Sequence, residues 1–264
     1  MNGFIFSSLT TIVPLGVIIY VSYRNLRALQ KKGPWVPAVL FMFILTIWLA
    51  TGFYWATHTL MMEEFLYDFS AMDIGENGLF LLMAALVGAS FREPLPRDLP
   101  AFVTSFALAI GNALLWGVWN GSWLRDIIAG LFLWLLVYTL IRGLKQTGCM
   151  NRSTWIFFGV GSAGILLLQI ATVLTKGTIS AVFDFSSEVF WFLGILYFIF
   201  RIVRFLREDL PEKGAVILAC AGCTWVLCTM YMSSEPYYTI ADLINVFMLL
   251  LMMLVLERKW GESI

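Results

Sequence analysis

The sequence predicts an all-α integral membrane protein with about nine transmembrane helices, arranged as one helix followed by two four-helix repeats. Three observations support this prediction: an apolar composition, basic residues confined to alternate connections, and short segments that recur at a fixed spacing. Of the 264 residues, 60% are hydrophobic and 13% are charged, and the mean hydropathy is +0.85. A soluble domain typically carries about 25% charged residues, so the chain is predicted to lie in a bilayer.

Nine apolar stretches approach the roughly 20 residues that a helix needs to cross the hydrocarbon core. In chain order they lie at about 5–23, 36–57, 75–91, 101–120, 124–142, 154–174, 187–206, 214–232 and 238–256. Most prolines fall near the ends of these stretches, as expected for a residue without an N–H donor. Pro14 lies inside the first stretch and is expected to kink it. The third stretch is short, so we expect its start to be unwound or tilted.

The distribution of basic residues predicts the orientation of the chain. All but two of the 17 Lys and Arg residues fall in every second connection, the exceptions being Arg125 and Lys176. Because cytoplasmic connections are enriched in Lys and Arg, we expect the N-terminus outside, the C-terminus in the cytoplasm, and insertion in the plasma (inner) membrane. No basic region precedes the first stretch, which is typical of an anchor rather than of a cleavable signal peptide.

Four landmarks recur at nearly the same spacing, which predicts an internal duplication of about 116 residues. The recurring landmarks are Asp68 with Asp184, Asp126 with Asp242, 92–96 with 207–211, and Arg142 with Arg258. A unit of four helices returns the chain to its starting side, so the two copies would be related by a pseudo-twofold axis along the membrane normal. We therefore divide the chain into an N-terminal anchor helix with its basic loop (1–33), a first four-helix repeat (34–149) and a second one (150–264).

Acidic residues on the expected outer side are the candidate ligand-binding groups. The candidates are Asp68, Asp184, Asp126, Asp242, Glu76 and Glu188, together with the aromatic residues Trp119 and Trp123. The predicted symmetry would bring the acids to a shared outer vestibule, where carboxylates in a low dielectric favour a bound cation or proton. Aromatic rings beside acids can also hold an organic cation by cation–π contact.

Each of these residues also has a purely structural interpretation. An acid in the first turn of a helix can accept hydrogen bonds from free N–H groups and faces the positive end of the helix dipole. Trp residues near helix ends are typical of the aromatic belt at the membrane boundary. Within the apolar stretches, Asn112, Gln169 and Asn245 either join helices by hydrogen bonds or line a polar path.

The sequence predicts no cofactor, and it leaves the identity of any metal unknown. His58 is the only histidine, and the acid-rich segment 63–76 lacks the ligand spacing of an EF-hand loop. We interpret that segment as an amphipathic helix at the membrane surface. Cys220 and Cys223 form a Cys-x-x-Cys pair inside an apolar stretch, where packing is a simpler interpretation than redox or metal chemistry. Phosphate-binding loops, zinc-protease and serine-hydrolase motifs are absent, so an enzyme is the less favoured class.

The favoured function is a small transporter that binds a cation or a protonated organic amine at an outward-facing acidic and aromatic site between the two repeats. One alternative is a membrane receptor, sensor or complex subunit that binds a ligand outside and signals to a cytoplasmic partner. Another is a membrane-embedded enzyme or assembly factor. The expected partners are the lipid bilayer, a small cationic ligand, and a cytoplasmic or membrane protein. Nucleic-acid binding is not expected, because membrane topology accounts for the basic residues.

Overall fold

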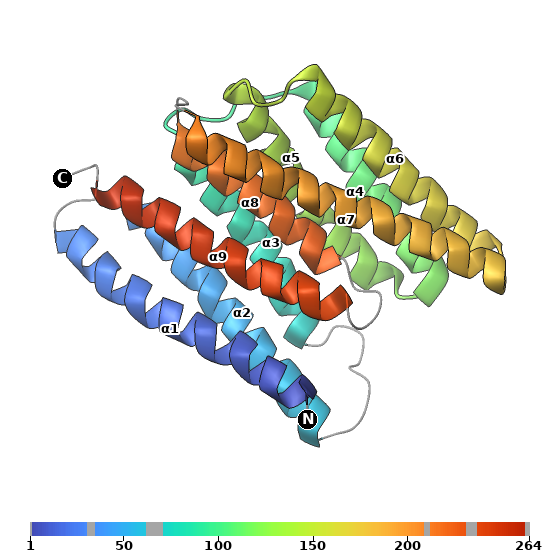
Figure 1. Ribbon diagram of the computed structural model, residues 1–264, viewed down its shortest axis with the longest axis horizontal. Coiled ribbons are helices and arrows are strands. Elements are labelled where there is room, and N and C mark those ends of the chain that lie inside the picture. The colour runs from blue at the N-terminus through green and yellow to red at the C-terminus, as the bar shows by residue number, and fades with distance from the viewer. Residues whose placement is uncertain (1, 31–34, 62–70, 209–211, 231–236, 262–264) are drawn as a thin grey trace.

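The structure, a computed structural model, describes residues 2–30, 35–61, 71–208, 212–230 and 237–261. These residues form nine α-helices and contain no strand. In chain order the helices are α1 (Asn2–Gln30), α2 (Trp35–Met61), α3 (Ala71–Ser90), α4 (Leu99–Asn120), α5 (Trp123–Gln146), α6 (Arg152–Leu174), α7 (Thr178–Arg207), α8 (Lys213–Met230) and α9 (Tyr237–Gly261). The prediction of an all-α protein is confirmed for this part of the chain (Figure 1).

Two local expectations from the sequence are a kink at Pro14 and an unwound or tilted start of the third apolar stretch. α1 continues as a helix through Pro14. α3 is helical from Ala71 onward, so the start of the third apolar stretch, predicted at 75, is not unwound.

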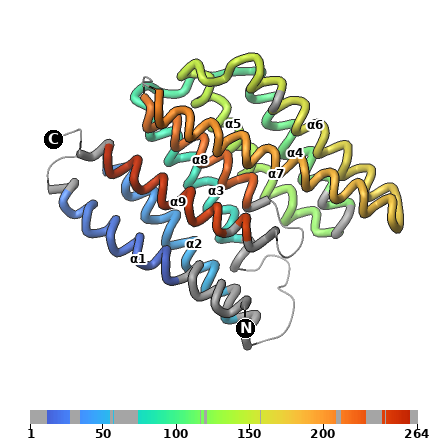
Figure 2. The backbone as a smooth tube through the Cα atoms, in the orientation of Figure 1, coloured from blue at the N-terminus to red at the C-terminus, as the bar shows by residue number. Residues whose placement is uncertain are grey.

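The helices pack in two layers (Figure 1 and Figure 2). One layer holds α2, α3, α5 and α4 in that order, and the other holds α1, α9, α8, α7 and α6. The layers are joined where α2 meets α1 and α9, where α3 and α5 meet α8, and where α4 meets α6. The first layer therefore comes from residues 35–146, and the second comes from α1 together with residues 152–261.

The order of the helices differs between the two layers. α3 packs against α5, and α4 lies beyond α5, whereas α6, α7, α8 and α9 follow one another in chain order. A pseudo-twofold axis would give both halves the same order, so the packing does not support the predicted symmetry. The duplication and the division of the chain at residues 33 and 149 stay predictions from the sequence.

α8 lies at the centre of the molecule, in contact with α3, α5, α7 and α9. Every residue from Ala215 to Val226 is buried. A Cβ added to Gly222 would lie 3.0 Å from Cδ2 of Leu140 on α5, so this glycine permits the close approach of the two helices. Helices in a bilayer associate by close packing rather than by exclusion of water, which explains why small residues occur at this contact.

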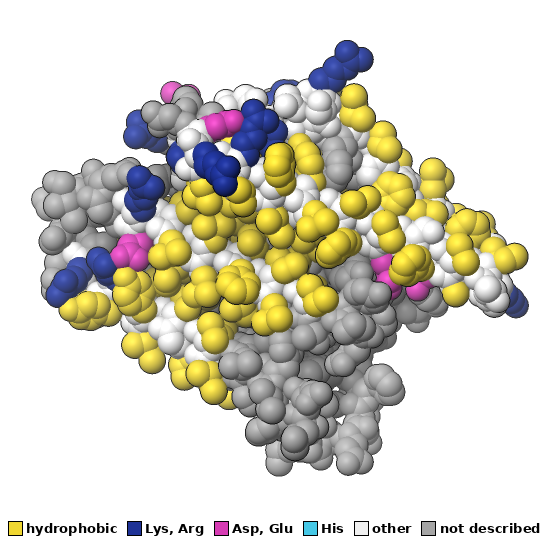
Figure 3. Space-filling view, viewed as in Figure 1, with side chains coloured by type: hydrophobic (Ala, Val, Ile, Leu, Met, Phe, Trp, Pro, Cys, Tyr) yellow, Lys and Arg dark blue, Asp and Glu magenta, His cyan; other side chains and the backbone are white. Residues whose placement is uncertain are grey.

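The described helices are compatible with a polytopic membrane protein. Four segments are long and apolar enough to cross a membrane: Trp35–Tyr54, Trp123–Gln146, Arg152–Leu174 and Thr178–Arg207. Three further apolar segments are shorter: Ile74–Ser90, Leu99–Leu115 and Lys213–Cys228. Large apolar side chains cover much of the visible surface in Figure 3, as a lipid-facing surface requires. The count of nine spans and the orientation of the termini stay predictions.

Basic side chains gather at the left and top of the view in Figure 3. Here α1 and α9 are joined by an ion pair in which Arg24 Nη2 lies 2.5 Å from Oε1 of Glu257. Tyr20 strengthens the pair, because its hydroxyl donates a hydrogen bond of 2.9 Å to the same carboxylate oxygen. The first and last helices of the described chain are therefore held side by side.

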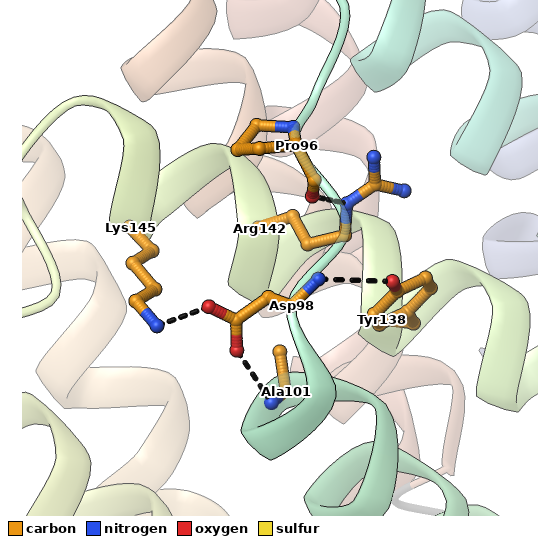
Figure 4. A network of polar contacts seen from close by, with 6 residues as sticks. All are labelled: Pro96, Asp98, Ala101, Tyr138, Arg142 and Lys145. Atoms are coloured by element: carbon orange, nitrogen blue, oxygen red, sulfur yellow. Dashed lines mark hydrogen bonds and ion pairs between the residues drawn. The ribbon is translucent and has the colours of Figure 1, made fainter.

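A second polar network at this end joins the start of α4 to the end of α5 (Figure 4). Asp98 caps α4, since its Oδ1 accepts a hydrogen bond of 2.8 Å from the backbone N–H of Ala101. Its other oxygen pairs with the Lys145 ammonium, and its backbone N–H donates to the Tyr138 hydroxyl at 3.4 Å. The contacts with Lys145 and Ala101 hold the pKa of the Asp98 carboxyl below its ordinary value.

Candidate functional site

The eight predicted site residues are spread over five helices and one segment outside the described residues. Asp68 lies in that segment. Trp119 lies on α4 and Asp242 on α9, but their side chains are not described. The remaining five residues lie on α3, α5 and α7, and the structure places their side chains.

Asp126 lies in the first turn of α5, where it faces the positive end of the helix dipole as the structural interpretation predicts. Its hydrogen bond, however, is with a neighbouring side chain rather than with a free backbone N–H: Arg125 Nε donates to Oδ1 at 3.1 Å. The Asp126 side chain is 11% exposed, and its Oδ2 is buried without a hydrogen-bond partner in the described part of the chain.

Trp123, one turn before Asp126, has a packing role. Its ring lies against Gly117 on α4, where an added Cβ would come within 2.7 Å of the indole. This contact closes the tight connection between α4 and α5, which turns through Gly121 at φ 79°, a conformation that favours glycine. About 45% of Trp123 remains exposed.

Asp184 and Glu188 lie one turn apart on α7 in different surroundings. Asp184 is exposed, whereas Glu188 is buried, with 9% of its surface exposed. α7 begins at Thr178, so Asp184 lies inside the helix and not just before it, as the predicted stretch 187–206 implied. Residues 178–186, which lie before the predicted stretch, extend α7 at its start.

The four described candidate acids lie on three helices. Glu76 lies on α3, Asp126 on α5, and the other two acids on α7. Among the described residues, no three His, Cys, Asp or Glu side chains lie close enough together to hold a metal ion. The shared acidic vestibule therefore stays a prediction.

Two polar residues at the basic end, which were not predicted, act as helix caps. Asp98 caps α4, and Asn151 caps α6 by accepting a hydrogen bond of 2.9 Å from the backbone N–H of Thr154. The Thr154 hydroxyl also contacts the Tyr197 hydroxyl on α7 at 2.7 Å. Asp or Asn directly before an apolar run, with Pro100 in the first turn of α4, is the sequence signal that identifies such caps.

An apolar cavity lies between α4, α5, α6, α7 and α8. Its volume is about 520 Å³. Most of the lining is apolar, including Leu133 on α5, Phe190 and Phe198 on α7, and Val226 on α8. Leu133 and Phe190 lie near the middle of their helices, so the cavity reaches the depth of the apolar surface.

Asn112 on α4 supplies the principal amide group in this lining. It is 9% exposed, and its Oδ1 is buried without a hydrogen-bond partner among the described residues. The interpretation of Asn112 as a residue that joins helices by hydrogen bonding through this oxygen is thus not supported. An unpaired buried amide costs free energy unless a ligand or water satisfies it.

α6 forms the outer wall of the cavity. Gly161, which has no side chain, and Ser162 line it, and a Cβ added to Gly161 would meet nothing within 4 Å. Val160 on α6 is 61% exposed and Leu193 on α7 is 50% exposed, although both line the cavity. The cavity therefore opens sideways, to the outside of the helix bundle.

Cys220 and Cys223 on α8 are free, buried thiols, and Cys223 lines the cavity. Among the described residues, they belong to no group of three His, Cys, Asp or Glu side chains that could hold a metal ion. Their surroundings fit the interpretation of two small packing residues.

No protein-family model matches the chain, and comparison with curated proteins and with solved structures finds no match.

Proposed function

We propose that this polytopic membrane protein binds a largely apolar small molecule within the bilayer, in the cavity bounded by the five helices from α4 to α8. The observation that supports the proposal is the cavity itself, which is about 520 Å³ in volume and apolar, with Asn112 as a polar residue in its lining. Small-molecule sites are typically concave, about 300–1,000 Å³ in volume, and apolar with a few placed polar groups. This cavity has each of these properties.

The sideways opening supports a ligand that enters from the lipid. Val160 and Leu193 lie at the edge of the cavity and are themselves exposed, so a ligand dissolved in the bilayer reaches the lining without crossing water. The Asn112 carboxamide offers an acceptor and two donors, which would orient a ligand that carries a hydroxyl or carbonyl group. An apolar molecule with one polar group is therefore the class of ligand that fits.

The test uses two glycines of α6 as a matched pair. A Cβ on either Gly161 or Gly159 meets nothing within 4 Å, but only Gly161 lines the cavity. The full chain in lipid nanodiscs is exposed to a photoactivatable long-chain alcohol, and the adducts that excess unlabelled alcohol suppresses are mapped to peptides. We expect Gly161→Phe to remove the suppressible adducts on α6 and α7, and Gly159→Phe to keep them. Equal labelling of the two variants would reject the cavity as the site.

A second candidate function is the transporter for a cation or protonated amine predicted from the acids. It is supported by Asp126, whose side chain is only 11% exposed and whose Oδ2 has no partner among the described residues. Arg125 already balances part of this charge, so a bound cation would compete with it. The measurement is the thermal unfolding midpoint of wild type and of Asp126→Asn/Asp242→Asn across a panel of amines, metal ions and pH values. A ligand that stabilises both proteins equally would rule out these acids as its site.

Carrier and receptor roles differ in the step that comes after ligand binding. A carrier moves the photoactivatable alcohol, or an amine, between leaflets or across a vesicle membrane at a rate that depends on protein. A receptor or complex subunit binds the same molecule without flux and requires a partner protein. An enzyme or assembly factor would convert a substrate or be needed to build another complex.

A further inference from the structure

A buried guanidinium lies near the basic C-terminal end of α7. Arg201 on α7 is 9% exposed, although α7 carries two other arginines, Arg204 and Arg207, that are exposed. Burial of a charged group is costly unless an opposite charge and hydrogen bonds compensate for the lost water. The surroundings of Arg201 are therefore informative.

The protein compensates this charge only in part. Arg201 Nη2 donates a hydrogen bond of 2.7 Å to the backbone carbonyl of Cys149, and the guanidinium carbon lies 4.6 Å from the centre of the Phe205 ring and 6.0 Å from that of Tyr197. None of the ion pairs among the described residues involves Arg201. A guanidinium has five N–H donors in a fork that matches an anionic oxygen pair, and most of these donors are not used by described residues.

The position of Arg201 relates this charge to the cavity. Phe198, which lines the cavity, lies three residues earlier on the same side of α7. Cys149, whose carbonyl accepts from Arg201, lies in the connection before α6, and Ser153 in the first turn of α6 also lines the cavity. Arg201 therefore lies about one helical turn beyond the apolar lining, at the end nearest the basic edge of the bundle.

We propose that the ligand of the cavity is an amphiphile whose acyl chain fills the apolar space and whose anionic head group pairs with Arg201. The proposal rests on the proposed function of the cavity and adds the chemical class of the ligand. A carboxylate or phosphate supplies the counter-charge that the described side chains do not, while the chain replaces the missing packing between α4, α5 and α6. A free fatty acid and an anionic phospholipid share this chemistry, and the experiment distinguishes them.

The experiment compares probes that differ only in charge. Binding of the detergent-purified full chain is measured at pH 8 by native mass spectrometry for a C16 fatty acid, the C16 alcohol, phosphatidylglycerol and phosphatidylcholine. For wild type we expect the fatty acid or phosphatidylglycerol to bind about 10-fold or more tightly than the neutral probe of matched chain length, because charged hydrogen bonds of this kind are worth at least a factor of ten. The preferred anionic probe identifies the source of the head group.

The variants separate this inference from the proposed function. Arg201→Gln should lose the preference for the anionic probe and keep binding of the C16 alcohol, and Arg201→Lys should keep part of the preference. Arg204→Gln is the matched control, since Arg204 is exposed and pairs with Glu208 instead. Gly161→Phe should lose both probes.

Two outcomes would overturn the inference. Equal binding of acid and alcohol in wild type, or an unchanged preference in Arg201→Gln, would reject the role of Arg201 while leaving the cavity as an apolar site. Absence of binding of all four probes to wild type would instead reject the proposed function, and the inference with it. If Arg201→Gln does not fold, Arg201→Lys decides. A partial loss of the preference in Arg201→Lys, with Arg204→Gln unchanged, supports pairing with the Arg201 guanidinium, because lysine lacks the bidentate fork. Complete retention of the preference by Arg201→Lys would reject that pairing.

Discussion

Two regions of the same bundle use the same kinds of residue to opposite effect. Around α8, where α3, α5 and α8 meet, glycine lets helices touch: a Cβ on Gly222 would lie 3.0 Å from Leu140. Around the cavity, where α4, α6 and α7 meet, glycine leaves room, and a Cβ on Gly161 would meet nothing within 4 Å. An apolar helix with small residues therefore does not by itself indicate tight packing, because the neighbouring helix decides whether the space is filled.

Buried polar groups differ between the two regions in the same way. In the centre, Thr224 on α8 and Ser90 on α3 each donate to a carbonyl one turn earlier on their own helix, at 3.0 Å and 2.7 Å. In the wall of the cavity, the oxygen of Asn112 has no partner among the described residues. Thr224 and Ser90 are thus satisfied within their own helices, whereas the buried oxygen of Asn112 is not satisfied by any described residue.

The largest expected effect distinguishes two leucines on α5. Leu136 is fully buried in the central core, and Leu133, one turn earlier, lines the cavity. Leu136→Ala should lower the free energy of unfolding by about 2–5 kcal/mol, because it creates a void that the close-packed core cannot refill. Leu133→Ala should cost clearly less, since its side chain already borders empty space. Denaturant unfolding in detergent measures both, and equal losses would show that the cavity wall is as tightly packed as the core.

A smaller effect, of opposite sign at a tight helix contact and at the cavity, is expected when glycine becomes leucine. At Gly130 on α5 an added Cβ would lie 2.6 Å from Cβ of Ala113 on α4, so Gly130→Leu should cost about 1–3 kcal/mol through overpacking. Gly161→Leu should be neutral or stabilise by up to about 1 kcal/mol, because leucine favours a helix more than glycine does. Thermal unfolding of the two variants, with Gly159→Leu as the control, tests the contrast. A large loss of stability in Gly161→Leu would contradict an open cavity.

A third prediction concerns the polar network that fixes α4, one wall of the cavity. Asp98→Ala removes the cap of α4 and the pair with Lys145, and should cost about 0.5–2 kcal/mol. Asp98→Asn keeps a capping oxygen and loses only the charge, so it should cost less. Stability measured against pH separates the two contributions.

The sign of the pH dependence is set by the direction of the Asp98 pKa shift. The pKa of the Asp98 carboxyl is lowered in the folded protein. The ionised carboxyl therefore stabilises the fold fully above its ordinary pKa of about 4, and this stabilisation is lost as pH falls towards the lower pKa of the folded state. The difference in the free energy of unfolding between wild type and Asp98→Asn should therefore become smaller as the solution is acidified below about pH 4. A constant difference over that range would show that the Lys145 pair contributes nothing.

The smallest effect is expected at Asn112. Asn112→Leu replaces a buried amide whose oxygen lacks a partner among the described residues, so the ligand-free protein should be unchanged or stabilised by up to about 1 kcal/mol. The same change should weaken binding of the C16 alcohol. Thr224→Val in the centre is the matched comparison: it removes a hydroxyl that is hydrogen-bonded and should destabilise slightly. Destabilisation by Asn112→Leu alone would indicate that the amide has an internal partner.

The sequence predicted the helices far better than their arrangement. Each of the nine apolar stretches corresponds to one described helix, since length and hydropathy depend on local composition. Helix order in the layers depends instead on which faces fit together, and so the placement of α5 between α3 and α4 had no local signal. The repeat landmarks at Asp126 and Asp242 likewise predicted a symmetry that the packing order does not follow.

The site was predictable only in part. Asn112 stood out as a polar residue at membrane depth, yet its exposure to a cavity depends on four other helices that meet around it. Arg201 was one of several basic residues near the expected inner end of the stretch 187–206, and nothing in the sequence separates it from Arg204, one turn later. Arg201 is buried where it contacts the Cys149 carbonyl, before α6, and the Phe205 ring on α7.

The central position of α8 also sets the order in which the fold can be completed. During synthesis α3 and α5 leave the ribosome long before the helix that separates them from α7 and α9, because α8 begins only at Lys213. Their inward surfaces must therefore wait in the membrane, covered by lipid or by the insertion machinery, until most of the chain has been made. Truncation before α8 should leave the layer of α2, α3, α5 and α4 without its central partner, whereas truncation after Met230 should keep the contacts of α3 and α5 with α8.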